Sequence, residues 1–167
     1  LLSRLFRDTG LVLVDPTDPP LKELMSSVFV DELTHPLHTT DTVMESASRL
    51  EQLGFTPQIH RGSDAMNVFL YEENQRAAVT YSDGRIHAHN AARSFTVDEA
   101  AAMAESNPES FSHNVITRPI VQDTILPALA YVGGPSEIAY YAQLSGVYKH
   151  FGLPYPIVVP RASIPLV

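Results

Sequence analysis

The stretch Ala128-Leu-Ala-Tyr-Val-Gly-Gly-Pro-Ser-Glu137 decides how the fold is interpreted, because its pattern changes halfway. Its first five residues form the apolar run of a buried strand. Two glycines and a proline then introduce a long helix, which we expect from Pro135 to Phe151. The apolar run Ile157-Val-Val159 follows as a last strand. Strand, helix and strand within about 30 residues predict a parallel βαβ unit with a right-handed crossover.

The residues before position 55 also follow an α/β order. Their patterns predict a helix, a strand, a turn and two further helices, over 1–9, 11–14, 15–20, 21–34 and about 40–53. Leu11-Val-Leu-Val14 is typical of a strand covered on both faces. In the proline-rich turn after it we interpret Asp15 and Asp18 as turn-forming residues rather than acid–base groups.

The middle of the chain has a different pattern. Three short β-like segments, Val68–Tyr71, Arg76–Tyr81 and Arg85–His89, follow one another closely, with Asp83-Gly84 between the last two. Parallel pairing needs a long crossover, so these segments predict an antiparallel meander. The predicted fold is therefore a partial Rossmann-like parallel-sheet core, 1–55 and 96–167, interrupted by a small β-meander insertion, 56–95.

Helical signals return after the meander. Thr96-Val-Asp-Glu99 predicts a capping box at the start of a helix that ends near Ser106. Pro119 fits the first turn of a further helix to Ile125, with Pro127 after its end.

The composition limits the classes of function. A net charge of −8 with only 11 scattered basic residues disfavours a nucleic-acid partner. With no cysteine, the chain can form no disulfide or thiolate metal site. No apolar run reaches the ~20 residues of a membrane span, and no signal peptide is evident. These features favour a cytoplasmic protein, and a first residue other than Met suggests a fragment.

The turn Gly133-Gly-Pro-Ser-Glu137 is a candidate anion site, because ligands of βαβ units gather where the strand ends. Arg118 and Arg161 stand at predicted element boundaries and are the usual partners of carboxylate or phosphate. A purely structural turn explains the glycines equally well. The turn is neither a dinucleotide fingerprint nor a Lys-bearing phosphate loop.

The seven histidines do not predict a metal site. The pairs His35–His38 and His87–His89 could each chelate an ion, but no third ligand is evident near either pair. We therefore predict solvent-exposed histidines and no metal.

Three ordered motifs carry a resemblance to a known family: Asn114–Asp123, Ala128–Leu144 and Val158–Ser163. They resemble signatures of the bacillithiol biosynthesis cysteine-adding enzymes. The resemblance implies a Rossmann-like core and a cytosolic ligase step that joins L-cysteine to glucosaminyl-malate, with ATP or ADP as a candidate cofactor. It also implies that the chain is a middle portion of the enzyme, inactive alone, and that any homo-oligomer forms through a coiled coil absent here.

The resemblance also implies site residues. Matching positions that could bind substrate or anion are Asn114, Arg118, Gly133, Gly134, Ser136, Tyr140, Arg161 and Ser163. Glu137 is the candidate catalytic group, which could orient a substrate amine or simply cap the helix. Ser136 replaces a common glycine of the family and Tyr141 a common tryptophan.

Two other readings stay open at this stage. One is a non-catalytic Rossmann-like module that binds a nucleotide or a dicarboxylate. The other is a structural piece whose Gly133-Gly134 turn only packs a helix on a sheet.

Overall fold

A computed structural model of the chain describes residues 2–72, 75–89, 93–126 and 128–163. The predicted place of Pro127 lies outside these residues. The helices are α1 (Leu2–Leu5), α2 (Pro19–Thr34), α3 (His38–Gln52), α4 (Val97–Ser106), the 3-10 turn η1 (Pro108–Ser110), α5 (Thr117–Ile125), α6 (Pro135–Tyr141) and α7 (Ser145–His150). The strands are β1 (Ala65–Glu72), β2 (Gln75–Ser82), β3 (Arg85–Ala88), β4 (Arg93–Phe95), β5 (Phe111–His113), β6 (Ala130–Gly133) and β7 (Ile157–Pro160).

The larger sheet is antiparallel and has the order β4-β3-β2-β1-β5. It confirms the predicted meander of three strands. Asp83 and Gly84 both have positive φ, 51° and 73°, as a tight two-residue hairpin turn requires. The sheet also extends past the meander, because β5 pairs with β1. The predicted boundaries of the insertion, near residues 55 and 95, remain a prediction. Strand β5, which belongs to the predicted segment 96–167, lies in the same sheet as the strands of the predicted insertion 56–95.

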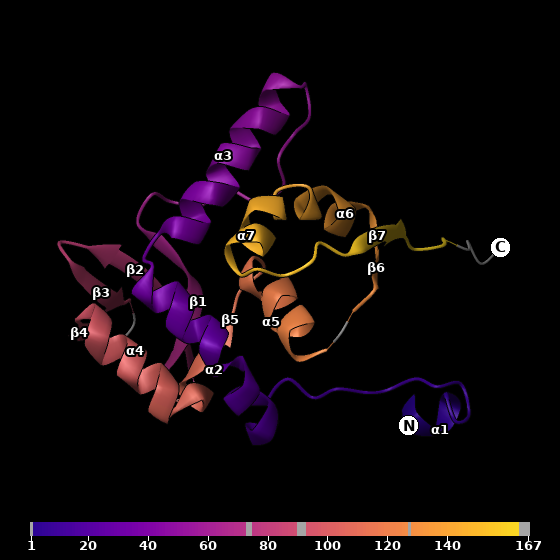
Figure 1. Cartoon of the computed structure of the whole chain (residues 1–167), viewed down its shortest axis with the longest axis horizontal. Helices are drawn as coiled ribbons and strands as arrows, with labels where there is room; N and C mark the ends of the chain where they lie inside the picture. The colour runs from indigo at the N-terminus through magenta and orange to yellow at the C-terminus, as the bar shows by residue number, and fades with distance from the viewer. Residues whose placement is uncertain (1, 73–74, 90–92, 127, 164–167) are drawn as a thin grey trace.

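Helices α2 and α4 pack on each other beside this sheet (Figure 1). The apolar face of α2 buries Met25, Val28, Phe29 and Leu33, as its helical spacing predicts. Leu24, which has a similar helical spacing, is 58% exposed. The predicted capping box of α4 is present: the Glu99 N–H donates to Thr96 Oγ1 over 3.2 Å, and the Thr96 N–H donates to Glu99 Oε2 over 2.7 Å.

The predicted βαβ unit is confirmed as β6 and β7 in parallel register, with helices between them. The single helix predicted from Pro135 to Phe151 is wrong, because the chain turns between α6 and α7. At this turn the buried Gln143 side chain binds the backbone of Gln58 and Ile59. The predicted burial of residues 128–132 is also wrong, since Leu129 is 81% and Val132 58% exposed.

The buried strand predicted at Leu11–Val14 is wrong. These residues adopt no regular structure, and their exposed fractions are between 41% and 77%. A strand forms only where a neighbour accepts and donates its backbone hydrogen bonds, and no strand of the described part of the chain lies against this segment. Figure 1 shows α1 set apart from the other helices, joined to them by this segment, and α1 has no buried residue.

The mixed α/β class predicted from the sequence is confirmed.

Candidate anion-binding site

The Gly133–Glu137 turn is held together by its own side chains. The Gly134 N–H donates to Glu137 Oε2 over 2.7 Å, and the Tyr131 hydroxyl donates to Glu137 Oε1. Arg161 Nη2 lies 3.7 Å from Glu137 Oε2, and the Arg161 N–H donates to the Gly133 carbonyl over 2.8 Å. The turn, Tyr131 and Arg161 therefore form one connected cluster at the carboxyl ends of β6 and β7.

Side chains lie close to both glycines, but only those beside Gly133 are fixed in place. A Cβ at Gly133 would lie 2.9 Å from the Tyr131 ring and 3.1 Å from the Glu137 Cβ. A Cβ at Gly134 would lie 2.7 Å from Arg161 Nη2. Gly134 has an ordinary φ of −74°, and the guanidinium that crowds it is the flexible end of a largely exposed side chain, so neither backbone conformation nor space demands glycine there. The N–H group of Gly134 is already bonded to Glu137 and is not available to an anion.

Glu137 is engaged through both carboxylate oxygens. The Tyr131 hydrogen bond, then the Gly134 N–H, lowers its pKa below the ordinary value, and Arg161 and Arg118 act in the same direction. A carboxylate with a lowered pKa and two occupied oxygens is a weak general base. This geometry favours the capping role of Glu137 over a catalytic one.

Arg118 projects from the first turn of α5 into a group of neutral partners. Its Nη2 donates to the hydroxyl of Tyr140 and, over 3.3 Å, to the hydroxyl of Tyr131, while Nη1 lies 3.4 Å from Gln122 Oε1. Among the described residues, no carboxylate lies within ion-pair distance of its guanidinium. Arg118 is thus a part-buried cation that is oriented but not neutralised, a state suited to binding an anion.

A cavity of about 340 Å³ opens beside Arg118. It is lined by Val12, Val14, Pro16, Met25, His113, Arg118, Val121, Gln122, Ile125 and Leu126. Burial, followed by the charges of Lys22, Arg118 and Arg76, lowers the pKa of His113 to about 4. Several cations therefore act on this cavity, although neither Arg161 nor the glycine turn lines it.

Tyr140 and Ser136 line a second hollow of about 290 Å³, together with Gln58, Ile59, His60, Arg61 and Val115. Tyr140 is buried and accepts the Arg118 hydrogen bond, so it lies between the two hollows. Ser136 is exposed and lines this second hollow, and no hydrogen bond of the described residues joins its side chain to Glu137. Ser163 is exposed, and none of its contacts joins it to either group.

Asn114 belongs to a different, buried network. Its Nδ2 donates to Asn67 Oδ1 over 2.9 Å, and its Oδ1 accepts the N–H groups of Ile116 and Thr117. Asn114 is 8% exposed and fixes the start of α5. The structure therefore brings together Arg118, Tyr140, Gly133, Gly134, Glu137 and Arg161. Ser136 shares only the second hollow with Tyr140, and Asn114 belongs to the separate buried network.

Sequence reasoning missed two residues of the candidate site, Tyr131 and His113, and two residues of a separate cluster around His35. Tyr131 links Arg118 to Glu137, and its place two residues before Gly133 on the same strand could have indicated it. His113 was not singled out at all. Near His35, where no third metal ligand was expected, the structure places Asp31 and His150.

Residues 1–162 match the model of the family described as bacillithiol biosynthesis BshC, N-terminal Rossmann-like domain. The chain belongs to this family. The match confirms the Rossmann-like class and places the chain in the N-terminal domain, which corrects the expected middle portion.

The curated relatives that match this chain include three proteins named "Putative cysteine ligase BshC". The protein of Chloroherpeton thalassium is 41% identical over 99% of this chain, and that of Geobacillus kaustophilus is 37% identical over 100%. The protein of Desulforamulus reducens is 33% identical over 100% of this chain. The chain spans only 29–31% of the length of these relatives. In the part of the chain that the structure describes, no helix is both long and apolar enough to cross a membrane.

Proposed function

We propose that this chain supplies part of the substrate-binding wall of a cytoplasmic ligase that joins L-cysteine to glucosaminyl-malate. The observation that carries the proposal is Arg118, a part-buried cation beside a cavity. Tyr131, Tyr140 and Gln122 hold its guanidinium, and no carboxylate of the described residues lies within ion-pair distance of it. The family match and the names of the relatives support a cysteine ligase of bacillithiol biosynthesis.

The substrates suit such a cation. Malate carries two carboxylates and cysteine one, so a guanidinium can bind either as a two-pronged donor. Arg118 would hold a carboxylate or phosphate, and Arg161, which is largely exposed, would add a second cation beyond Tyr131. Ser136, Tyr140 and Ser163 remain proposed contacts for substrate, and Gly133 and Gly134 allow Arg161 and Tyr131 to approach the turn.

Amide formation from a free carboxylate needs an activated acyl group and stabilisation of a tetrahedral oxyanion. ATP, with ADP as product, is the proposed source of activation. We propose that further groups come from parts of the longer relatives that this chain does not match, so that these residues alone are inactive. A homo-oligomer through a coiled coil in those parts belongs to the same proposal.

The test uses the longest natural protein that contains these residues. Arg118→Ala should weaken glucosaminyl-malate binding by about 1.5–3 kcal/mol, the usual value of a hydrogen bond to a charged group. Isothermal calorimetry gives the affinity, and mass detection of the cysteine adduct gives the activity. Arg49→Ala, on the outer end of α3 and paired with Glu45 at the surface, is the matched control.

Unchanged binding in a folded Arg118→Ala protein would show that the Arg118 guanidinium does not bind a substrate carboxylate. Arg118→Lys separates charge from geometry, because lysine keeps the cation but loses the two-pronged donor. Binding of malate or ADP without any product would favour the non-catalytic module. Binding of neither would leave the glycine turn a structural feature only.

A further inference from the structure

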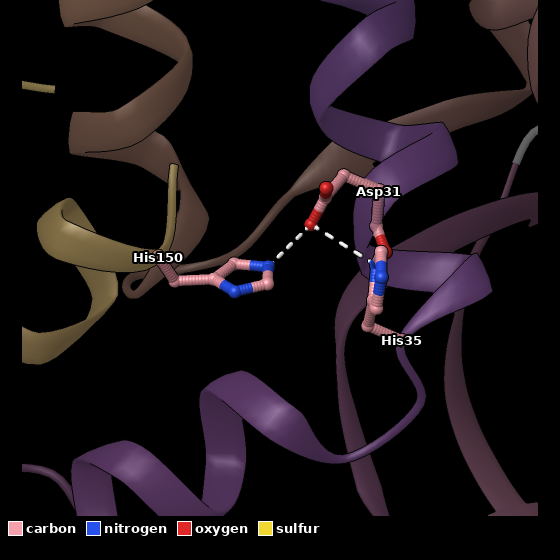
Figure 2. Close-up of side chains that lie close together, drawn as sticks. All are labelled: Asp31, His35 and His150. Atoms are coloured by element: carbon pink, nitrogen blue, oxygen red, sulfur yellow. Dashed lines mark hydrogen bonds and ion pairs between the residues drawn. The ribbon is translucent and has the colours of Figure 1, made fainter. Parts of the chain in front are cut away.

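A second group of ligand-type side chains lies away from the candidate anion site. Asp31 is in the last turn of α2, His35 follows that helix, and His150 is the last residue of α7 (Figure 2). Asp31 and His150 are 119 positions apart in the sequence. The three side chains point toward one another, and one ligand atom of each lies within 4.8 Å of the others.

The distances are close to those around a bound metal ion. The His35 Nδ1 lies 3.6 Å from Asp31 Oδ1, and the His150 Nε2 lies 2.5 Å from the same oxygen. Bonds of 2.0–2.2 Å to a tetrahedral Zn²⁺ ion separate its ligand atoms by about 3.4 Å. The Asp31–His35 pair already has about this separation. The Asp31–His150 pair would reach it if the His150 imidazole moved by about 1 Å, and the zinc–ligand bond lengths would impose this movement.

We propose that Asp31, His35 and His150 bind one divalent transition-metal ion of the Zn²⁺ class. Two imidazoles and one carboxylate suit Zn²⁺ or its neighbours, whereas Mg²⁺ and Ca²⁺ prefer oxygen ligands. The His35 side chain is 55% exposed and that of Asp31 33%, so water can complete the coordination. In the metal-free protein an Nδ1 proton of His35 can donate to the Asp31 carbonyl over 3.1 Å, and the ion takes the place of that proton.

Neighbouring residues hold the group in position. The His38 ring, at the start of α3, packs against His150 with ring centroids 4.3 Å apart. Phe151 packs edge-on against the same imidazole at 4.9 Å. The His150 side chain is consequently only 16% exposed, so one ligand is fixed while the other two can adjust.

The ion would fasten the end of α7 to the end of α2. Asp31 already accepts a hydrogen bond from His150, and a metal ion would replace this one bond by a three-sided link. An ion that binds only the folded state adds stability in proportion to its concentration over its dissociation constant. This inference is independent of the role proposed for Arg118.

The test is a titration of the full-length, tag-free protein with Zn²⁺ by calorimetry and with Co²⁺ by visible absorption. We expect one ion per chain, and at least a tenfold weaker affinity in His150→Ala and in His35→Asn. The exposed His89→Ala is the matched control and should bind as the unchanged protein does. Saturating Zn²⁺ should raise the melting temperature of the unchanged protein and of the control only.

Equal Zn²⁺ affinity in the unchanged protein and in His35→Asn would overturn the proposal, as would the absence of one-to-one binding. His35→Asn is decisive because its more exposed side chain can be replaced without removing the Asp31–His150 hydrogen bond. Circular dichroism confirms the fold of each variant. If His38→Ala weakens binding as strongly as His150→Ala while His35→Asn has no effect, the ligand set proposed here is wrong.

Discussion

The molecule has two halves that use their strands differently: an antiparallel half, α2 to β5, and a βαβ half, α5 to β7. In the antiparallel sheet, α2 and α4 bury the apolar side chains, and both Phe29 and Phe111 are almost inaccessible to solvent. In the βαβ half, the two parallel strands leave Val132 and Ile157 58% and 61% exposed. Parallel sheets are ordinarily covered on both faces. The contrast shows that a strand signal in the sequence reports local conformation, whereas burial depends on what packs against the strand.

The two halves are joined by polar groups as well as by packing. A shift of register in β1 between Ala65 and Phe69 releases the backbone of Asn67 from the sheet. The Asn67 N–H donates to Glu32 Oε1, and its carbonyl accepts from Thr117 Oγ1 at the start of α5. On the other side, Gln143 binds the backbone at residues 58 and 59. Breaking these contacts should measure how strongly each half depends on the other.

The largest expected loss comes from the core of the antiparallel half. Phe29 is 0% exposed, and its ring centroid is 6.1 Å from that of Phe111. Phe29→Ala should lower the free energy of unfolding by about 3–5 kcal/mol through the lost burial and the cavity. Val132→Ala, on the exposed strand, should change it by less than about 0.5 kcal/mol. Urea denaturation followed by circular dichroism measures both, and equal losses would erase the contrast between the halves.

A smaller, pH-dependent effect is expected at Glu32, on α2 in the antiparallel half, where its carboxylate binds the Asn67 backbone. Burial, opposed by hydrogen bonds from Thr39 and Asn67, raises the pKa of Glu32 from 4.5 to about 7. The folded state thus binds this proton more tightly than the unfolded state. Its contribution to stability is complete below about pH 4.5 and is lost as the pH rises through 7, an effect on the order of 3 kcal/mol.

Glu32→Gln keeps an acceptor for the Asn67 N–H but cannot ionise. The stability of Glu32→Gln relative to the unchanged protein should therefore rise between pH 4.5 and 8, measured by urea denaturation at each pH. Glu23→Gln, on the exposed side of the same helix, is the control. Parallel stability curves for the Glu32→Gln and unchanged proteins would show that Glu32 does not titrate in this range.

The smallest of the three effects is expected at the attachment of the βαβ half. Gln143 Oε1 accepts the N–H groups of Gln58 and Ile59 at 2.8 Å each, and Nε2 donates to the Ile59 carbonyl over 3.0 Å. Gln143→Leu should cost about 2 kcal/mol, since these backbone groups lose their partners while water reaches only some of them. Hydrogen exchange at the Ile59 amide should accelerate, and exchange in β2 should not.

Gln52→Leu, at the exposed end of α3, is the control for this change. If exchange at Ile59 stays slow in Gln143→Leu, the side chain is not what holds the segment. If β2 opens together with Ile59, the two halves unfold as one unit and the contrast drawn here is only structural.

Local chemistry was predicted well. The Asp83-Gly84 turn and the Thr96–Glu99 capping box involve residues at most three positions apart, so the sequence contains all their partners. The break between α6 and α7 could not be predicted, because Gln143 finds its partners more than 80 positions away. The strand predicted at Leu11–Val14 is wrong for the same reason, since an apolar run forms a strand only where another strand lies beside it.

The candidate site shows the same difference between what motifs predict and what the folded chain decides. Arg118, Tyr140, Glu137 and Arg161 were singled out from motifs and element boundaries, and the structure brings them together around Tyr131. The same motifs also included Asn114, whose buried amide serves the start of α5 instead. Motifs identify residue types at fixed spacings, but they do not say which way a side chain points.

The sequence by itself determined the capping box of α4, the hairpin turn, the three-stranded meander and the family. These features depend on hydrogen bonds and apolar spacing within a few residues. Only the tertiary structure decided that Arg118 has no carboxylate partner among the described residues, that Glu137 is occupied, and that His150 meets Asp31 from 119 positions away. The Asp31–His150 contact joins distant segments, and the partners that Arg118 and Glu137 find depend on how their side chains pack in the folded chain.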